Sequence, residues 1–212
     1  MKHIRSIVPS IAALLGLSIA HIATATDGPE LLVDGGFEGA VFGGCPNPCA
    51  TSCSFSIAPW SRGGWITEDL VRNSNAYPCS SVPVNPRGGQ YFVSLQGSVC
   101  CDCDNNGTIA QSVSIEVGRK YRLRADLFLD AYDAIQFSCG GATTVFDPSN
   151  TPTMAWTTVE WTFTAGVSAS SVSIRSTGTP YAPGCMEADN AYVDNISLRQ
   201  TTPTVCIGDI VS

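Results

Sequence analysis

The strongest constraint on this chain is a period-two alternation of apolar and polar residues that recurs in short runs along its length. In the run at 157–163, for example, Val159, Trp161 and Phe163 fall on one face and polar residues fall on the other. Such alternation is typical of β-strands with one buried face. Clusters of Gly, Pro, Asn and Asp separate the runs, and helix-period patterns are nearly absent after residue 25. The chain is therefore expected to be all-β.

The alternating runs predict strands at 64–71, 90–95, 108–117, 121–130, 134–139, 157–164, 171–176 and 191–198. The runs at 108–117 and 121–130 flank a Gly118-Arg119 turn and are expected to form an antiparallel hairpin. Many short strands of this kind describe a jelly-roll β-sandwich. Its core is expected to contain the following apolar residues: Val113, Ile115, Leu123, Leu127, Val159, Trp161, Phe163, Ile174, Ile196 and Leu198.

The first 25 residues are typical of a secretory signal peptide. Lys2 and Arg5 precede a mostly apolar stretch at 7–20, and Ala23-Thr24-Ala25 is a small-x-small cleavage site. No later segment is apolar enough to span a bilayer, so no membrane insertion of the mature chain is expected. The expected organisation is a signal peptide at 1–25, a β-sandwich domain at 26–200 and a tail at 201–212. The protein is expected to be secreted, extracellular or at the cell surface.

Composition excludes several classes of function. Both histidines, His3 and His21, lie in the signal peptide, which excludes a Ser-His-Asp triad and a His-ligated zinc site from the mature chain. The sequence has 11 Lys and Arg against 18 Asp and Glu, and Lys2 and Arg5 are also lost with the signal peptide. An acidic chain of this kind argues against a nucleic-acid partner.

Ten cysteines follow the cleavage site, and an even number in an exported chain predicts disulfides. The dense spacings at 45–53 and 100–103 also allow a metal cluster, although neither has the paired CxxC motifs of a zinc ribbon. We expect the loops at 45–53, 79 and 100–103 to be stapled to one another by disulfides. The cysteines are Cys45, Cys49, Cys53, Cys79, Cys100, Cys101, Cys103, Cys139, Cys185 and Cys206.

A series of short motifs appears in a fixed order between residues 31 and 198. The segments are LLVDGGFE at 31–38, GW at 64–65, PRGGQYFV at 86–93, IAQS at 109–112, GRKYRL at 118–123 and YVDNISL at 192–198. Together they resemble the galactose-binding-like jelly-roll superfamily, most closely the DUF642-type extracellular domains and related carbohydrate-binding modules. The resemblance implies a galactose-binding-domain-like sandwich that binds a polysaccharide or cell-surface glycan without catalysis. Asp34, where the family usually has Asn, and the cysteine-rich loops depart from its pattern.

The resemblance also implies a structural calcium ion shared by Glu38 and Asp194. Ca²⁺ prefers several oxygen ligands, which carboxylates and loop carbonyls supply. The alternative is that Glu38 caps a turn and Asp194 is hydrogen-bonded at the end of a strand. A second candidate is the loop Asp102-Cys103-Asp104-Asn105-Asn106-Gly107, which matches the first half of an EF-hand loop but has Val113 where a bidentate Glu should stand. A disulfide-pinned turn is the alternative for this loop.

Aromatic residues near the predicted loops are candidates for stacking against sugar rings. The candidate ligand-binding residues are Trp60, Trp65, Tyr77, Tyr132 and Tyr181. The alternative for Trp60 and Trp65 is packing beneath the cysteine-rich loop.

Three function classes follow: a carbohydrate-binding module, a structural matrix or surface protein without a specific sugar site, and a glycoside hydrolase. A hydrolase needs paired carboxylates, for which Glu68 with Asp69, or Glu187 with Asp189, are the nominal candidates. Adjacent strand residues face opposite sides of a sheet, which disfavours the first pair. The tail at 201–212 is expected either to be a Thr/Pro linker to a missing scaffold-attachment segment, or to return through a disulfide at Cys206.

Overall fold

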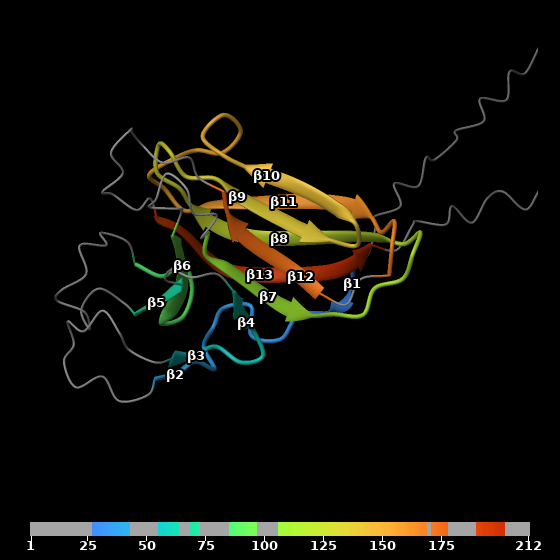
Figure 1. Ribbon diagram of the computed structural model, residues 1–212, viewed down its shortest axis with the longest axis horizontal. Helices are drawn as coiled ribbons and strands as arrows, with labels where there is room; N and C mark the ends of the chain where they lie inside the picture. Colours follow the sequence, from blue (N-terminus) through green and yellow to red (C-terminus); the bar gives the residue numbers. More distant parts are fainter. Residues whose placement is uncertain are drawn as a thin grey trace, which may run out of the picture.

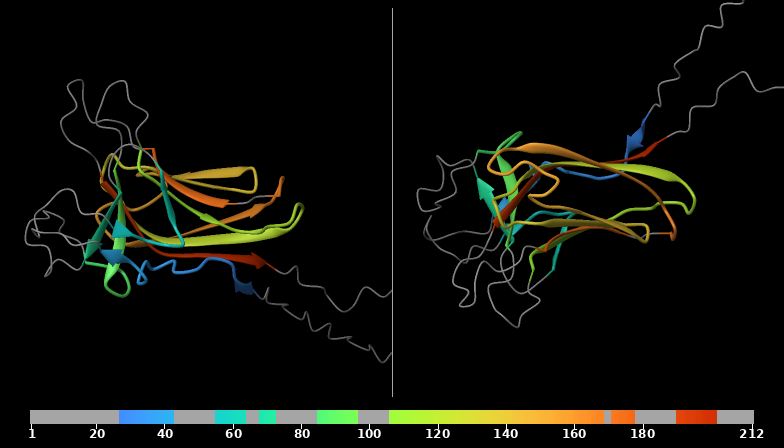
Figure 2. Two further views of the ribbon diagram at one scale, coloured as in Figure 1. Left: turned by 60° about the horizontal axis from the view of Figure 1, so that its bottom comes forward. Right: turned by 90° about the horizontal axis from the view of Figure 1, so that it is seen from above.

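The computed structural model describes residues 27–42, 55–63, 68–72, 85–96, 106–168, 171–177 and 190–201. Within these ranges the chain forms β-strands, which make two main sheets stacked as two layers (Figures 1 and 2). The all-β, two-sheet sandwich is therefore confirmed. None of the described segments is a helix long and apolar enough to cross a membrane. The predicted signal peptide and almost all of the predicted tail lie outside the described residues.

The larger sheet contains the longest strand of the molecule at its centre. Its members are β1 (Asp27–Glu30), β5 (Glu68–Arg72), β6 (Tyr91–Gln96), β8 (Lys120–Phe128), β11 (Thr157–Thr164) and β13 (Asn190–Thr201). The order is β11-β8-β13-β6-β5, and β1 pairs with the far end of β13. All these pairings are antiparallel. The beginning and the end of the described chain therefore lie side by side (Figure 1).

The second sheet covers one face of the first. Its strands are β4 (Ser61–Gly63), β7 (Thr108–Ser112), β9 (Ile135–Cys139), β10 (Ala142–Phe146) and β12 (Ser171–Ser176), in the order β10-β9-β12-β7-β4. A two-residue ladder of β2 (Val41–Phe42) and β3 (Phe55–Ser56) lies apart from both sheets. The observed ranges of β11 and β12 are those that the alternation predicted.

The core fills the space between the facing sides of the two sheets. Tyr121, Leu123, Ala125 and Leu127 all point inward from β8, as their alternation requires. The predicted core is confirmed, with Val113 and Trp161 only partly buried but packed against it. Burying a side chain the size of Leu or Ile contributes about 1.5–3 kcal/mol, so this face holds the layers together.

The predicted hairpin of 108–117 with 121–130 is wrong. β7 pairs with β12 and β4, whereas β8 pairs with β11 and β13 in the other sheet. The connecting residues cross from one layer to the other, and Ile115 is buried on the way. The alternation continues through this crossing because the core is on the inner side of both sheets. Periodicity therefore identified the buried face but not the strand's partner.

The hairpin of β9 and β10 was not expected, although its turn carries a clear sequence signal. Gly140 and Gly141 connect the two strands with φ angles of 61° and 78°. Two successive positive φ angles favour glycine and suit the right-handed twist of a two-residue hairpin. The Gly-Gly pair after the run IQFSC was therefore sufficient to predict this turn.

Cysteine pairing is described at only one position. Cys139 is a free, buried thiol at the end of β9, and burial raises its pKa to about 11. Cys139 is therefore not part of a disulfide, which leaves the prediction that most cysteines are paired untested. The other nine lie outside the described residues, and their disulfides stay a prediction.

One extra residue interrupts the pairing of β13 with β8. Asp194 pairs with Asp126 and Ser197 pairs with Arg124, so β13 advances three residues while β8 advances two. Asn195 takes a φ of 49°, in the left-handed region that Asn tolerates better than most residues. The irregularity is a β-bulge, a feature that re-aims side chains and is enriched beside functional sites.

The turn at 34–39 lies directly on this bulge. The Ile196 N–H donates to the Gly35 carbonyl oxygen over 2.9 Å, and Asp34 accepts the N–H groups of Glu38 and Gly39. A Cβ atom on Gly35 would lie 1.8 Å from the Ile196 carbonyl oxygen. Position 35 therefore requires glycine, because any side chain there would prevent the turn from packing against the backbone of β13.

We expect Gly35→Ala to destabilise the fold, because either the turn or the bulge must shift to admit the methyl group. The expected loss is about 2 kcal/mol or more in the free energy of unfolding, or roughly 4 °C or more in Tm. Thermal unfolding followed by circular dichroism measures it. Gly63→Ala is the matched control, since its Cβ would only touch Thr108 at 4.0 Å. Equal Tm values for the two variants would contradict this account of the turn.

Candidate functional site on the outer face of the larger sheet

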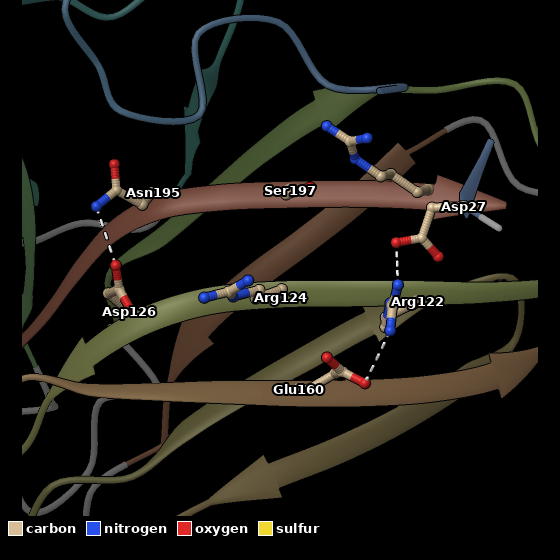
Figure 3. A pocket seen from close by; sticks show the side chains of 8 residues that line it. Asp27, Arg122, Arg124, Asp126, Glu160, Asn195 and Ser197 are labelled. Atoms are coloured by element: carbon tan, nitrogen blue, oxygen red, sulfur yellow. Dashed lines mark hydrogen bonds and ion pairs between the residues drawn. The ribbon is translucent and has the colours of Figure 1, made fainter. Parts of the chain in front are cut away.

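The outer face of the larger sheet carries a polar groove of about 460 Å³. β8, β11, β13 and β1 all contribute to it, and Figure 3 shows their side chains gathered on this face. The lining residues are Asp27, Arg122, Arg124, Asp126, Glu160, Asn195, Ser197 and Arg199. All eight are polar or charged, which suits a ligand rich in hydroxyl groups.

Strand register places these side chains in rows across the sheet. Arg124 of β8 lies opposite Glu160 of β11 on one side and opposite Ser197 of β13 on the other. Directly opposite side chains in a sheet have Cβ atoms about 4.5–5.5 Å apart. The polar side chains that alternate with the core residues along each strand therefore form the floor of the groove.

The bulge adds an amide to one end of the groove. The Asn195 Nδ2 group donates to Asp126 Oδ2 over 2.9 Å, and the Thr158 hydroxyl donates to Asp126 Oδ1 over 2.5 Å. Asp126 is buried and is held as a hydrogen-bond acceptor by these two neutral donors. Without the bulge, residue 195 would face the core, because strand residues alternate between the two faces.

The other end of the groove is held by ion pairs. Arg122 pairs with Asp27 and, at 3.5 Å, with Glu160 (Figure 3). Arg199 pairs with Glu30 at 3.2 Å, and Ser197 donates its hydroxyl to the same carboxylate. These contacts tie β1 and β11 to the two central strands.

Arg124 differs from the other two arginines. Its guanidinium has no hydrogen bond or ion pair within the described part of the chain, and in Figure 3 it lies between Asp126 and Arg122 without a partner. Its side chain is exposed. The centre of the groove therefore carries a cation that is open to a ligand.

A cluster of four aromatic rings continues the same face beyond Asp126. Tyr192 and Phe92 pack edge to face at 5.5 Å, and Trp156 packs against Phe92 at 5.6 Å and against Phe128 at 5.9 Å. The Trp156 indole N–H donates to the Asn85 carbonyl oxygen over 2.7 Å. Burial, and then the charges of Asp133 and Asp130, raise the pKa of Tyr192 to about 12. The outer face therefore joins an aromatic end to a charged end.

The two predicted aromatic ligand residues that the structure describes, Trp60 and Tyr132, do not line this groove. Trp60 is 4% exposed, packs on Phe37, and donates its indole N–H to the Asp34 carbonyl oxygen. This burial leaves no ring face for a sugar and agrees with the alternative of packing. Tyr132 is 47% exposed on the turn after β8. Trp65, Tyr77 and Tyr181 lie outside the described residues.

The groove residues were overlooked in the sequence because they form the polar half of predicted strands. Arg122, Arg124 and Asp126 alternate with the core residues of β8, and Glu160 does so in β11. Alternation assigns such residues to solvent. A concentration of both charge signs on neighbouring strands was the available signal.

The predicted pair Glu38 and Asp194 does come together. Each would lie within about 4 Å of a Cβ atom on Gly36, at 3.9 Å and 4.0 Å respectively. Both carboxylates hold the same segment: Asp194 accepts the N–H groups of Arg87 and Gly88, and Glu38 accepts those of Gln90 and Tyr91. Gly89 lies so close to Glu38 that a Cβ would be 2.1 Å from its Oε1. The pair therefore clamps residues 87–91 against the bulge.

This arrangement does not fit a calcium ion as it stands. Asp194 also accepts the Asn195 N–H at 2.7 Å, so N–H donors occupy both of its oxygens. Calcium needs six to eight oxygen ligands, and no group of three or more acidic, Cys or His side chains within the described ranges could hold a metal. The alternative of a capping Glu and a hydrogen-bonded Asp matches the observed contacts.

The second predicted metal loop is described at one position only. Asp102 and Asp104 lie outside the described residues. Asn106 lies just before β7, and its Oδ1 atom is buried without a hydrogen-bond partner in the described part of the chain. Metal binding by this loop stays a prediction.

Comparison with known proteins identifies the fold and no closer relationship. No family model and no curated protein sequence matches this chain. TmCBM61, solved in complex with beta-1,4-galactotriose, has a TM-score of 0.50 at 15% identity, covering 82% of this chain and 99% of that one. The CBM22-1 xylan-binding domain of Paenibacillus barcinonensis Xyn10C has a TM-score of 0.40 at 12% identity, covering 68% and 86%. The chain therefore has a two-sheet β-sandwich fold similar to that of TmCBM61, and the resemblance to DUF642-type domains stays a prediction.

Asp194 predicts a pH dependence of stability. Burial raises its pKa to about 6, against the lowering effect of its three N–H donors. The native state therefore binds a proton more readily than the unfolded chain between about pH 4 and 6, where an unfolded Asp has already ionised. Stability contributed by this group is present at low pH and is lost as the pH rises through 6. One carboxyl contributes a slope of at most about 1.4 kcal/mol per pH unit.

We expect the wild type to lose stability relative to Asp194→Asn as the pH rises from 4 to 7, measured by urea unfolding in the presence of a chelator. Asp147→Asn is the matched control. Hydrogen bonds from Ser149 lower the pKa of Asp147 on an exposed turn. The wild type is therefore expected to gain stability relative to Asp147→Asn as the pH rises, which is the opposite of the trend for Asp194→Asn. A difference between wild type and Asp194→Asn that is constant with pH would contradict the prediction.

Proposed function

We propose that this protein is a secreted, non-catalytic carbohydrate-binding module that holds a polysaccharide or cell-surface glycan in the groove on the outer face of its larger sheet. The observation that carries the proposal is the groove itself, about 460 Å³ in volume and lined by eight polar side chains. Export is supported by the signal-peptide pattern of residues 1–25 in the sequence.

The chemistry of the groove suits a sugar chain. Guanidinium, amide, hydroxyl and carboxylate groups lie on neighbouring strands of the groove. Donors and acceptors are therefore both available to sugar hydroxyls. Phe128 follows Asp126 on the same face of β8 and leads to the Trp156 cluster. Apolar surface beside a few fixed polar groups is typical of small-molecule sites. The shared fold with TmCBM61 supports the same proposal.

A hydrolase is the less favoured function. The two carboxylates that face each other diagonally across the groove are Asp126 and Glu160. Glycosidases need one of two carboxyl groups to be protonated as a general acid. Here Asp126 accepts hydrogen bonds from Thr158 and Asn195, while Glu160 pairs with Arg122, so both are held as acceptors. A purely structural protein is also less favoured, since it would have no need of a groove that leaves Arg124 without a partner.

Calcium at Glu38 and Asp194 stays a prediction, and a bound ion would have to replace N–H donors on Asp194. Such an ion would stabilise the charged carboxylate and lower the pKa of Asp194. Calcium added to chelator-treated protein is then expected to raise Tm, and to raise it more at pH 7 than at pH 5. Differential scanning calorimetry measures both values. An unchanged Tm at both pH values would rule the ion out.

The proposed function is tested by affinity electrophoresis and isothermal titration calorimetry against neutral and acidic polysaccharides. We expect at least one polymer to bind, and Ser197→Gln to weaken that binding by about tenfold, since it extends a neutral side chain across the groove floor. Ser173→Gln makes the same change on β12, on the opposite sheet, and is expected to bind like the wild type.

Three results would count against the proposal. Failure of every polymer to bind would exclude a carbohydrate-binding module. Equal weakening by Ser197→Gln and Ser173→Gln would place the site elsewhere. Release of reducing ends from a bound polymer, lost on Glu160→Gln, would favour the hydrolase.

A further inference from the structure

We infer that the glycan bound in this groove carries a carboxylate, as in a uronic acid residue, and that Arg124 binds that carboxylate. The inference rests on the proposed function and specifies the class of sugar that the same groove takes.

The first argument is the position of Arg124. Arg124 lies on β8 between Arg122 and Asp126 of the same face. Its neighbours across the sheet are Glu160 of β11 and Ser197 of β13, so it lies in the middle of the groove floor. Its side chain is exposed, and within the described part of the chain its guanidinium has neither a hydrogen bond nor an ion pair. A ligand lying along the groove would pass directly over it (Figure 3).

The second argument is that the neighbouring charges are already satisfied. Arg122 is paired with Asp27 and Glu160, and Arg199 is paired with Glu30. The remaining acid of the groove, Asp126, accepts hydrogen bonds from Thr158 and Asn195. The lining has three arginines and three acids, and Arg124 is the one among these six whose side chain makes neither a hydrogen bond nor an ion pair within the described part of the chain. Its positive potential is available to an anionic group of the ligand.

The third argument is the geometry of the guanidinium group. Its planar fork of N–H donors matches a carboxylate through two parallel hydrogen bonds, which are about twice as strong as neutral ones. A single sugar hydroxyl presents one neutral oxygen to this fork, so it lacks both the second oxygen and the negative charge of a carboxylate. The structure therefore offers the ligand a stronger contact if the ligand carries a carboxylate.

The overall charge of the protein favours isolated carboxylates over a dense polyanion. The chain has a net charge of −7, which repels a polymer with many closely spaced sulfates. Charges farther away than about 8 Å are screened at physiological ionic strength, whereas a contact with Arg124 is not. A single uronate seated on Arg124 is compatible with both facts.

The experiment compares acidic polysaccharides with their carboxyl-reduced forms, which keep the same backbone. Glucuronoxylan, whose carboxylates are widely spaced, is the main probe, polygalacturonate and alginate are the densely charged comparisons, and binding to the full chain is measured by isothermal titration calorimetry. We expect at least one acidic polymer to bind about tenfold or more tightly than its reduced form.

Arg124→Gln is expected to lose about tenfold or more in affinity for the acidic form and to leave affinity for the reduced form unchanged. Arg124→Lys keeps the positive charge but lacks the planar fork of donors. Its affinity for the acidic form is expected to lie between those of the wild type and Arg124→Gln. Arg175→Gln makes the same charge change on β12 of the opposite sheet and is expected to bind like the wild type. An unchanged Tm verifies that each variant is folded.

Each remaining outcome overturns the inference in an identifiable way. Equal binding of acidic and reduced forms, or full affinity in Arg124→Gln, overturns the uronate and leaves the proposed function standing. Preference for a sulfated polymer, with chondroitin sulfate as the probe, also overturns it. Absence of binding to acidic, reduced and neutral polymers alike overturns the proposed function, and the inference falls with it.

Discussion

The extra residue in β13 is the feature on which the rest of the described site depends. It allows Asp194 to hold residues 87 and 88 while Asn195 reaches over the outer face to Asp126. The Ile196 N–H then remains available to the Gly35 carbonyl oxygen, which seats the turn at 34–39. An uninterrupted strand would direct these consecutive side chains to alternate faces, and one of the three contacts would be lost. A single left-handed residue thus joins a turn, a loop and a groove that are far apart in the sequence.

The clamp at this bulge carries an electrostatic cost that its hydrogen bonds offset only in part. Asp194 is fully buried, and removing a carboxylate from water disfavours its charged form. Three backbone N–H groups converge on it and stabilise that form, although the raised pKa indicates that desolvation outweighs them. Backbone N–H groups in a tight loop have few other partners, so the same contacts also satisfy donors that would otherwise be buried alone. Two acids therefore hold the backbone of residues 87–91, and Tyr91 at the end of this segment also packs into the core.

The sequence was sufficient to predict the fold class and much of the core, because alternation reports directly on burial. The strands at 157–164 and 171–176 and the inward face of β8 were all visible in this way. The partner of each strand was not visible, since β7 and β8 show the same pattern whether they form a hairpin or cross between layers. Trp60 was a candidate both for ligand binding and for packing, because sequence cannot distinguish a loop aromatic that packs on Phe37 from one that faces solvent. The groove was missed for a related reason: only register shows that Arg124, Glu160 and Ser197 are neighbours.

The position of Asn195 also has a practical consequence for producing the protein. Asn195-Ile196-Ser197 is an N-glycosylation sequon, and its asparagine is exposed at the edge of the groove. An oligosaccharide attached to Nδ2 would replace one hydrogen of the group that donates to Asp126 and would project over the floor where Arg124 lies. A eukaryotic expression host that modified this site would produce a protein whose own covalent glycan fills the groove. Material made in a host without N-glycosylation, or as Ser197→Ala, would keep the groove open.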